Sequence, residues 1–193
     1  MKTRWVVLVT LAVPAGVFAQ SAGGNTANPI TTAFTRSIGY ESKNIQEAFD
    51  SIPESKFSYK PTPAQLSFGY IAQHVADDNY LFCEQFGDLK PTRSDKEKNT
   101  PDSVKATWSK DTLVAQLKAS FAYCDKAMAQ LQDSKLGDEV SLTYEGKTYK
   151  RVRAGMVLGH ALDLADHYSQ LANYMRLNGM LPPTALPRKG GTA

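Results

Sequence analysis

The chain has 193 residues, of which 42% are hydrophobic and 21% charged, and its formal charge is +3. This length is typical of one domain and allows a sizeable hydrophobic core. The sequence contains no run of basic residues and no alternation of basic with aromatic residues, so it predicts a protein that does not bind nucleic acid.

The first 19 residues have the pattern of an export signal. Lys2 and Arg4 precede an apolar run that ends with Val17-Phe18-Ala19, which places small residues where a signal peptidase cleaves. A membrane anchor is the alternative, but the apolar run is short for a membrane span and contains Pro14. We therefore predict a signal peptide over residues 1–19 and a periplasmic or secreted mature protein without stable membrane insertion.

Removal of the signal peptide changes both the length and the charge. About 174 residues remain (193 less 19), and the formal charge falls from +3 to +1 because the only charged residues removed are Lys2 and Arg4. We expect a small, polar and flexible leader over residues 20–28, one folded domain over 29–183, and a disordered, Gly-rich tail over 184–193.

The first predicted helix spans Thr31 to Ile52, and Pro53 ends it because the proline ring cannot continue the helical hydrogen bonds. Glu41 falls within its apolar stripe. The sequence leaves open whether this carboxylate lies at the edge of the stripe or in a buried polar network. The stripe repeats at helical spacing and contains Phe34, Ile38, Ile45, Phe49 and Ile52.

A second helix is predicted from Thr62-Pro63 to about Gly87, with Thr62 as its N-cap and Pro63 in its first turn. His74 and Asp78 are four residues apart in it, so an imidazole and a carboxylate lie on the same side. We expect this pair to face the interior or a cleft. The apolar stripe beside it contains Leu66, Ile71, Val75 and Phe82.

A polar segment over residues 88–107 follows, and it has no apolar period. We expect it to be an exposed and mobile connection. A third helix begins after Ser109, a suitable N-cap, and Gly137 marks the end of this region. Its apolar stripe contains Leu113, Leu117, Phe121, Cys124, Met128 and Leu131.

The periodicity then changes from that of a helix to that of strands. Residues 140–144 alternate between apolar and polar, Glu145-Gly146 forms a turn and residues 148–150 follow, which predicts a small β-hairpin. The last helix begins near Arg153 and stops near Asn178-Gly179, where glycine suits a left-handed cap. Four helices of about 20–26 residues with one long crossover predict an all-α four-helix bundle with one small β-hairpin before the last helix.

The two cysteines, Cys83 and Cys124, fall in the second and third predicted helices. An even number of cysteines in an exported protein predicts a disulfide, here one that joins two helices. Two buried free thiols are the alternative. A catalytic thiol is disfavoured, because neither cysteine lies within two helical turns of a histidine.

The chain has three histidines, and two of them lie on one edge of the last helix. His160, Asp163, His167 and Gln170 follow one another at spacings that keep them on nearly one side. In a bundle, metal ligands come from facing helices. His74 with His167 and either Asp163 or His160 would give three protein ligands and an open position, the pattern of catalytic zinc that nickel or iron also accepts.

Two interpretations without metal remain open. His74–Asp78 and His167–Asp163 are each an imidazole beside a carboxylate, an arrangement suited to acid–base chemistry near neutral pH. The same residues are equally suited to a buried polar network that joins the second helix to the last. The sequence does not distinguish the two.

Several stretches of the chain are similar to the motifs of a known family. They are Phe57-Ser58-Tyr59-Lys60-Pro61-Thr62-Pro63, Ser67-Phe68-Gly69, His74, Asp166-His167-Tyr168-Ser169-Gln170-Leu171, Tyr174-Met175-Arg176, Asn178-Gly179 and Pro182-Pro183. On these motifs the chain resembles the DinB-like superfamily of bacterial four-helix-bundle proteins over most of the predicted mature chain. Ser169 stands where the family's last-helix motif usually has glycine.

The resemblance implies a metal site. Members of the family often bind a divalent metal, commonly zinc or nickel, through one histidine on the second helix and two histidines four residues apart on the last. His74 and His167 match the first and last of these ligands, and Asp163 stands where the other histidine is expected. A carboxylate can replace an imidazole as a ligand, and His160 is the alternative ligand. Asp78 and Gln170 would support the ligands from outside, as hydrogen-bond partners.

The resemblance also implies an activity, because the family includes thiol-dependent transferases and isomerases. Export argues against a low-molecular-weight thiol cofactor, since such thiols are cytosolic and the outside is oxidising. We expect an exported bundle with a His- and Asp-lined cleft that acts as a metal-dependent hydrolase or transferase on an unidentified small molecule. The alternative is a non-enzymatic stress-response or small-ligand-binding bundle with a degenerate metal site. A homodimer is left open.

Overall fold

The computed structural model describes residues 27–187, with the exception of residue 145. The predicted signal peptide, most of the predicted leader and the last six residues of the chain lie outside these described residues. No helix in the described part of the chain is both long and apolar enough to cross a membrane.

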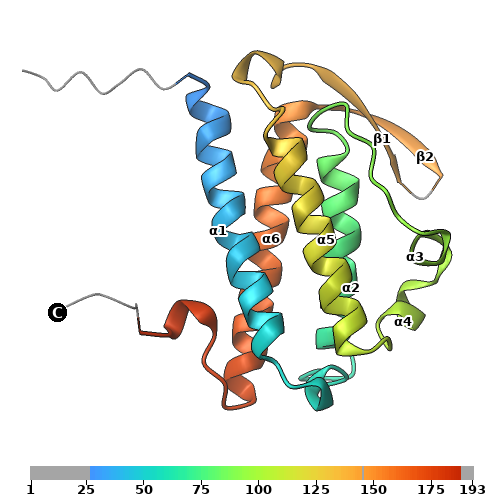
Figure 1. The fold of residues 1–193 in the computed structure, drawn as a ribbon, viewed down its shortest axis with the longest axis vertical. Helices are drawn as coiled ribbons and strands as arrows, with labels where there is room; N and C mark the ends of the chain where they lie inside the picture. Colours follow the sequence, from blue (N-terminus) through green and yellow to red (C-terminus); the bar gives the residue numbers. More distant parts are fainter. Residues whose placement is uncertain (1–26, 145, 188–193) are drawn as a thin grey trace, which may run out of the picture.

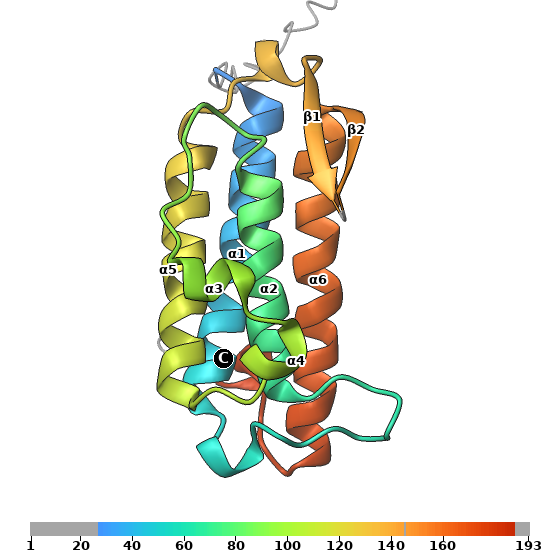
Figure 2. The same cartoon turned by 90° about the vertical axis from the view of Figure 1, so that its right-hand side faces the viewer.

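Four long helices form a bundle, and a two-stranded antiparallel hairpin lies beside one end of the last helix (Figures 1 and 2). Helix α2 packs against both α5 and α6, and α1 packs against the same two helices from the other side. The elements in chain order are α1 (Pro29–Ser51), η1 (Glu54–Lys56), α2 (Phe68–Cys83), α3 (Asp95–Asn99), α4 (Asp102–Lys105), α5 (Lys110–Met128), η2 (Asp133–Lys135), β1 (Glu139–Tyr144), β2 (Lys147–Val152), α6 (Arg153–Leu177) and η3 (Pro183–Ala185).

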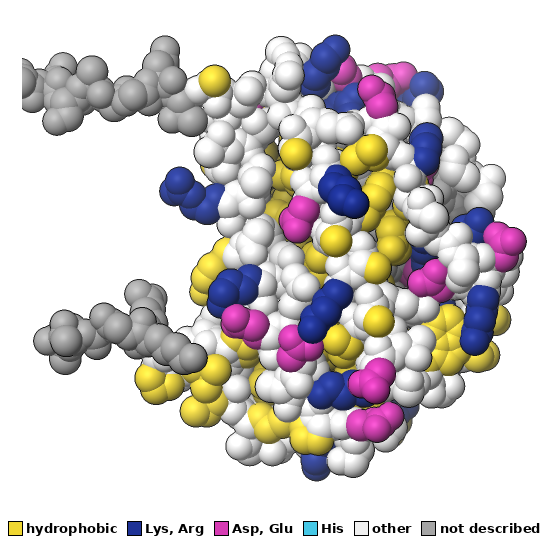
Figure 3. Space-filling view, in the orientation of Figure 1, with side chains coloured by type: hydrophobic (Ala, Val, Ile, Leu, Met, Phe, Trp, Pro, Cys, Tyr) yellow, Lys and Arg dark blue, Asp and Glu magenta, His cyan; other side chains and the backbone are white. Residues whose placement is uncertain are grey.

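The core is the set of apolar stripes that the four long helices turn toward one another. Each of the four helices contributes large side chains that are at most 2% exposed, for example Phe49, Phe68, Phe121 and Leu164. Burial of one such side chain stabilises the fold by about 1.5–3 kcal/mol. On the face drawn in Figure 3, acidic and basic side chains are interspersed and no patch of one sign forms. The predicted all-α bundle with a small hairpin before the last helix is confirmed.

The second helix begins later than its sequence predicts, at Phe68 rather than at Thr62-Pro63. Ser67 is its N-cap, and its hydroxyl accepts a hydrogen bond from the Tyr70 amide at 3.1 Å. The preceding segment is held outside the helix because the Phe68 and Gly69 amides donate back to the Tyr59 and Phe57 carbonyls. The helix also ends earlier, at Cys83 instead of Gly87.

The connection between α2 and α5 is mostly exposed, as predicted, but it also contains short helices and a buried attachment that the sequence did not indicate. It contains α3 and α4, of which α4 packs against α2 (Figure 2), and α3 begins with a reciprocal capping box between Ser94 and Glu97. Lys105 at the end of α4 is only 5% exposed and pairs with Asp77 of α2. This segment is attached to the bundle by ion pairs and not by an apolar stripe. The apolar periodicity of the sequence therefore does not reveal the attachment.

The ends of the last helix agree with the prediction more closely. Helix α6 follows directly on β2 and ends at Leu177, where Gly179 adopts a left-handed φ of 70°. The Met180 amide donates to the Met175 carbonyl at 2.9 Å, which closes the helix end. The chain remains folded beyond the predicted boundary at residue 183, because Thr184 forms hydrogen bonds with the Tyr168 hydroxyl.

The predicted disulfide is confirmed between Cys83, the last residue of α2, and Cys124 of α5. Their separation of 41 residues gives a loop whose closure contributes about 3–4 kcal/mol in the chain-entropy model. Glu41, whose place the sequence left open, is partly buried in α1 with one carboxylate oxygen shielded from solvent. Burial raises the pKa of Glu41.

Gly69 provides a test of how closely the α3–α4 connection approaches α2. A Cβ at this position would collide with the Ala106 carbonyl oxygen and lie 3.3 Å from that of Phe57. We expect Gly69→Ala to lower the free energy of unfolding by about 1–3 kcal/mol, because two backbone segments must move.

Gly39→Ala in α1 is the matched control, because nothing lies within 4 Å of the added Cβ. This variant should gain up to about 1 kcal/mol from helix propensity. Chemical denaturation of both variants measures the difference. If the two substitutions changed the free energy of unfolding equally, the close approach of Ala106 and Phe57 to Gly69 would be contradicted.

Candidate metal centre

Helices α2 and α6 face each other across the middle of the bundle and bring together two His–Asp pairs. On α2, His74 Nε2 lies 3.2 Å from Asp78 Oδ2, and on α6, His167 Nε2 lies 3.4 Å from Asp163 Oδ1. The His74 and His167 rings are perpendicular, with centroids 4.9 Å apart. One potential ligand atom from each of His74, Asp78 and His167 lies within 4.8 Å of the others.

The two aspartates therefore have different positions from those that the sequence indicated. Asp78, expected only as an outer partner, belongs to the three-residue group with the histidines. Asp163, expected as a ligand, contacts His167 but lies outside that group. Each aspartate lies beside the histidine four residues away on its own helix, but only Asp78 also lies within 4.8 Å of the histidine on the facing helix as part of the group.

His160, the alternative ligand, is not brought to this site. It is completely buried, its Nε2 lies 2.8 Å from Asn79 Oδ1, and its Nδ1 lies 3.9 Å from Cys83 Sγ. Seven residues separate it from His167, which is about 10 Å along the helix axis. Both ring nitrogens of His160 are directed at a separate cluster, so it is not an alternative to Asp163.

Gln170, expected to support the ligands, also has another role. Its side-chain amide donates to Asp166 Oδ2 at 2.7 Å on the surface of α6. This is an i, i−4 contact within one helix, and it places the amide away from the His–Asp group. The helical spacing in the sequence placed Gln170 on the same side of α6 as His167, but it did not identify Asp166 as the hydrogen-bond partner.

Burial and neighbouring charge shift the protonation of the site residues in different directions. Burial raises the pKa of Asp78 to about 7, and the Asp163 carboxylate adds to this effect. Burial and the nearby His167 lower the pKa of His74. Burial also opposes a charge on His167, but the hydrogen bond and negative charge of Asp163 outweigh it, so the pKa of His167 is raised.

Two atoms of the site are buried without a hydrogen-bond partner among the described residues: His167 Nδ1 and Asp163 Oδ2. A buried polar atom without a partner costs about 1–3 kcal/mol. The two imidazoles and the carboxylate of the three-residue group form a donor set that zinc, nickel and iron accept. The residues present therefore fit a divalent transition metal, because their donor atoms are ones that such metals bind and because a bound ion would give the buried His167 nitrogen a partner.

A cleft of about 570 Å³ lies beside the group and is lined by both His74 and Asp78. Tyr70, Tyr80 and Tyr144 contribute aromatic walls, and the Tyr70 ring lies 6.0 Å from that of His74. A larger cavity of about 740 Å³ shares Tyr70 with the cleft but contains none of the candidate ligands. The smaller cleft is therefore the one from which a small molecule could reach the His–Asp group.

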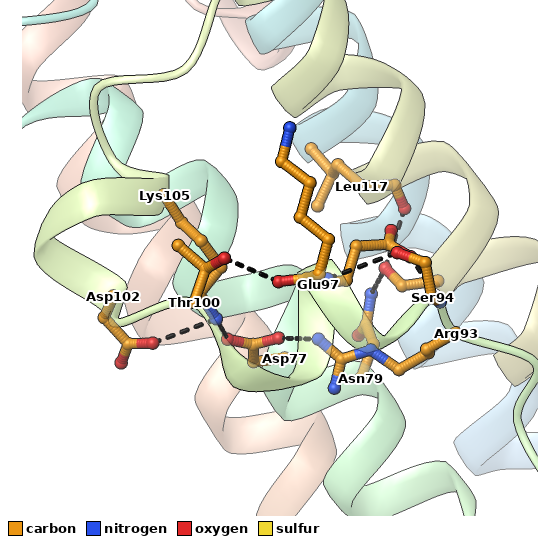
Figure 4. A network of polar contacts seen from close by, with 11 residues as sticks. Asp77, Asn79, Arg93, Ser94, Glu97, Thr100, Asp102, Lys105 and Leu117 are labelled. Atoms are coloured by element: carbon orange, nitrogen blue, oxygen red, sulfur yellow. Dashed lines mark hydrogen bonds and ion pairs between the residues drawn. The ribbon is translucent and has the colours of Figure 1, made fainter.

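Asp77, Arg93 and Asp102, which also line the cleft, belong to an ion-pair network that the sequence did not reveal (Figure 4). Asp77 of α2 pairs with both Arg93 and Lys105, and Lys105 also contacts Asp102 at 2.9 Å. The Arg93 guanidinium lies 4.5 Å over the Tyr80 ring. The one signal in the sequence was the adjacent acids Asp77-Asp78, which on a helix must project in different directions.

The fold and the site together define a helical bundle with a His- and Asp-lined candidate metal centre. The model of the DinB superfamily matches residues 41–171, so this chain belongs to the DinB superfamily. No match was found among curated proteins.

Solved structures with the same fold are similar to this chain at low sequence identity. A DinB-like protein from Bacillus cereus has a TM-score of 0.60 and 18% identity, with 79% of this chain and 95% of that chain covered. A mycothiol-dependent maleylpyruvate isomerase has a TM-score of 0.57 and 16% identity, with coverage of 73% and 60%. A conserved protein from Enterococcus faecalis has a TM-score of 0.55 and 16% identity, with coverage of 77% and 96%.

The raised pKa of Asp78 predicts a pH-dependent stability of the metal-free protein. A carboxyl group whose pKa is higher in the folded than in the unfolded chain contributes its full stabilisation at pH values below its pKa in the unfolded chain. That contribution is lost as the pH rises from about 4 to about 7. Asp78→Asn cannot ionise, so in the presence of a chelator it should be more stable than the wild type at pH 8, by about 2–4 kcal/mol, with little difference at pH 4.

Denaturant unfolding at a series of pH values in EDTA measures this difference. Asp125→Asn on the exposed side of α5 is the control, and it should leave the pH profile of the wild type unchanged. If the difference in the free energy of unfolding between Asp78→Asn and the wild type does not grow with pH, the Asp78 carboxylate is not destabilised by burial and the prediction is wrong.

Proposed function

We propose that this member of the DinB superfamily is a divalent-metal-dependent hydrolase or transferase that acts on a small molecule in the cleft beside α2. The observation that carries the proposal is the convergence of His74, Asp78 and His167, whose ligand atoms lie within 4.8 Å of one another at the edge of that cleft. Ligand atoms held at about 2.1 Å by one tetrahedral ion are about 3.4 Å apart. Small side-chain rotations suffice to reach this separation.

Each residue of the site has a distinct role in this proposal. His74, Asp78 and His167 hold the ion, which when bound would lower the pKa of a water molecule or polarise a substrate carbonyl. Asp163 is a positioning residue: its carboxylate accepts the Nε2 proton of His167 and leaves Nδ1, the orphaned buried nitrogen, as the free lone pair. Carboxylates commonly orient metal-binding histidines in this way.

The reaction class follows from the compartment as well as from the site. The solved structure of a mycothiol-dependent isomerase with this fold makes thiol-dependent transfer a relevant comparison. We also propose that the chain is exported, as its first 19 residues indicate, and the Cys83–Cys124 disulfide supports an oxidising environment. Low-molecular-weight thiols are scarce there, which favours hydrolysis over thiol transfer.

A second candidate is a ligand-binding bundle without catalysis. The observation in its favour is that each histidine already has a carboxyl group within 3.4 Å, so the four residues are paired without an ion. In this case the cleft would still bind a small molecule, and the polar group would serve to hold α2 against α6. The two candidates differ in metal content.

Metal analysis of the protein purified without chelator tests the first candidate. We expect about one zinc, nickel or iron ion per chain, and removal of the ion should lower hydrolysis of model esters, amides or phosphoesters. His74→Ala, His167→Ala and Asp78→Asn should each abolish stoichiometric binding, because three ligands are the minimum for a catalytic site.

Asp163→Asn separates the role of a ligand from that of a positioning residue. It should weaken metal binding about 10–100-fold without abolishing it, as measured by competition with a chromophoric chelator. Gln170→Ala on the surface is the matched control on α6 and should bind as tightly as the wild type. Absence of metal from the wild type, together with no metal-dependent gain in thermal stability, would favour the ligand-binding candidate.

A further inference from the structure

A second group of potential ligands lies deeper in the bundle, away from the His–Asp site. Sγ of Cys83, Sγ of Cys124 and a ring nitrogen of His160 all lie within 4.8 Å of one another. The three residues come from α2, α5 and α6, and each is at most 1% exposed. In the structure the two sulfurs form a disulfide, so the histidine faces sulfur atoms that are bonded to each other.

A chain of hydrogen bonds fixes which nitrogen of His160 carries the proton. The Ser120 hydroxyl donates to the Leu117 carbonyl at 2.8 Å, so its oxygen is free to accept from Asn79 Nδ2 at 2.9 Å. Asn79 Oδ1 is therefore the atom that faces His160 Nε2, at 2.8 Å, and Nε2 must donate. The lone pair is on Nδ1, which lies 3.9 Å from Cys83 Sγ.

Among the described residues, this lone pair has no donor while the disulfide is intact. A disulfide sulfur carries no proton, so Cys83 cannot donate to His160 Nδ1. Burial lowers the pKa of His160 to about 4, and the imidazole is therefore neutral at physiological pH. The structure thus holds a buried imidazole in the tautomer and protonation state that a metal ligand requires, with its free nitrogen directed at two cysteines.

We propose that Cys83, Cys124 and His160 form a second metal site, which exists only after the disulfide is reduced and which takes a thiophilic divalent ion such as Zn²⁺. A dithiol reductant supplies two electrons and two protons: its own sulfurs form a disulfide, and the Cys83–Cys124 bond becomes two thiols. The ion then displaces the two thiol protons and is held by two thiolates and His160 Nδ1. Its fourth position is open.

The surrounding structure suits this donor set. Two thiolates and an imidazole are preferred ligands of zinc, and Asn79 already holds the far side of the imidazole as outer partners of metal-bound histidines do. Two sulfurs on one zinc lie about 3.8 Å apart. The Cys83 and Cys124 Cα atoms, 5.2 Å apart in the disulfide, allow that separation with modest rotation and backbone relaxation.

The position of Cys83 at the end of α2 indicates how an ion could reach the group and what a bound ion would do to the bundle. Cys83 is the last residue of α2 and is followed by a turn rather than by further helix, so opening of one helical turn exposes the group. A bound ion would join α2, α5 and α6. It would replace the disulfide as a link between α2 and α5, so the bundle would stay linked under reducing conditions.

Cobalt titration of the reduced full chain tests the proposal. The His74→Ala/His167→Ala variant is used, so that the His–Asp site is removed and a failure of the proposed function does not affect the result. After reduction and anaerobic desalting, one equivalent of Co²⁺ should produce a sulfur-to-cobalt charge-transfer band and tetrahedral visible bands. The oxidised protein and the Cys83→Ser/Cys124→Ser variant should show neither.

His160 and Asn79 make the test specific to this geometry. His160→Gln should weaken Co²⁺ binding more than about 100-fold, and Asn79→Ala, which frees the imidazole to rotate, about 10–100-fold. Far-UV circular dichroism shows that each reduced variant is folded, and Zn²⁺ should displace Co²⁺ and raise the melting temperature of the reduced protein.

Three results would overturn the proposal. The first is a folded, reduced protein without a charge-transfer band at one equivalent of Co²⁺. The second is an equally tight site in Asn79→Ala and His160→Gln, which would show that the cysteines bind the ion without the imidazole. The third is a reduced chain that is unfolded and that neither Co²⁺ nor Zn²⁺ restores to the helical state.

Discussion

Helix α2 carries polar side chains that are removed from water on three sides, and the rest of the structure depends on how they are paired. It packs against α5 and α6 and is crossed by α4. A buried polar group left without a partner costs about 1–3 kcal/mol, which favours neighbouring elements that present a partner at the matching height. Gln73 of α2 is an exception, because its side-chain amide is buried without a partner among the described residues. The contacts are those of Asp77 with Lys105, of Asn79 with Ser120 and His160, and of the His74 ring edge-on with the His167 ring. These contacts fix the positions of the neighbouring elements along α2 in a way that apolar packing alone does not.

This constraint accounts for the arrangement of the two aspartates in the candidate metal centre. Asp163 occupies the place where the family resemblance implied a histidine ligand, and in isolation it suggested a site that had lost a ligand. In the fold, Asp78 reaches the same group from α2, and Asp163 is left to orient His167. The group therefore contains three candidate ligands, as the resemblance implied, but two of them lie on α2 and one on α6 instead of one and two.

Most of the fold could be predicted from the sequence, because the long helices and the hairpin each have a clear period. The start of α2 was misplaced because Thr62-Pro63 is a valid cap signal, and only the hydrogen bonds from Phe68 and Gly69 to the preceding segment exclude it. The attachment of the α3–α4 connection was missed because a buried lysine paired with an aspartate leaves no periodic signal. Of the site, the participating helices and both histidines were predicted, but which aspartate reaches the group depends on side-chain directions across an interface.

Asp78 and Asn79 show how one helix serves two separate polar clusters. They are adjacent in sequence, so their side chains leave α2 about 100° apart. Asp78 therefore joins the His–Asp group beside the cleft, while Asn79 enters the buried cluster around the disulfide. On α6 the same two clusters are served by His167 and His160, which are two turns apart. Cys83 lies four residues after Asn79, so about one turn of α2 separates the disulfide from the residues that serve the two clusters.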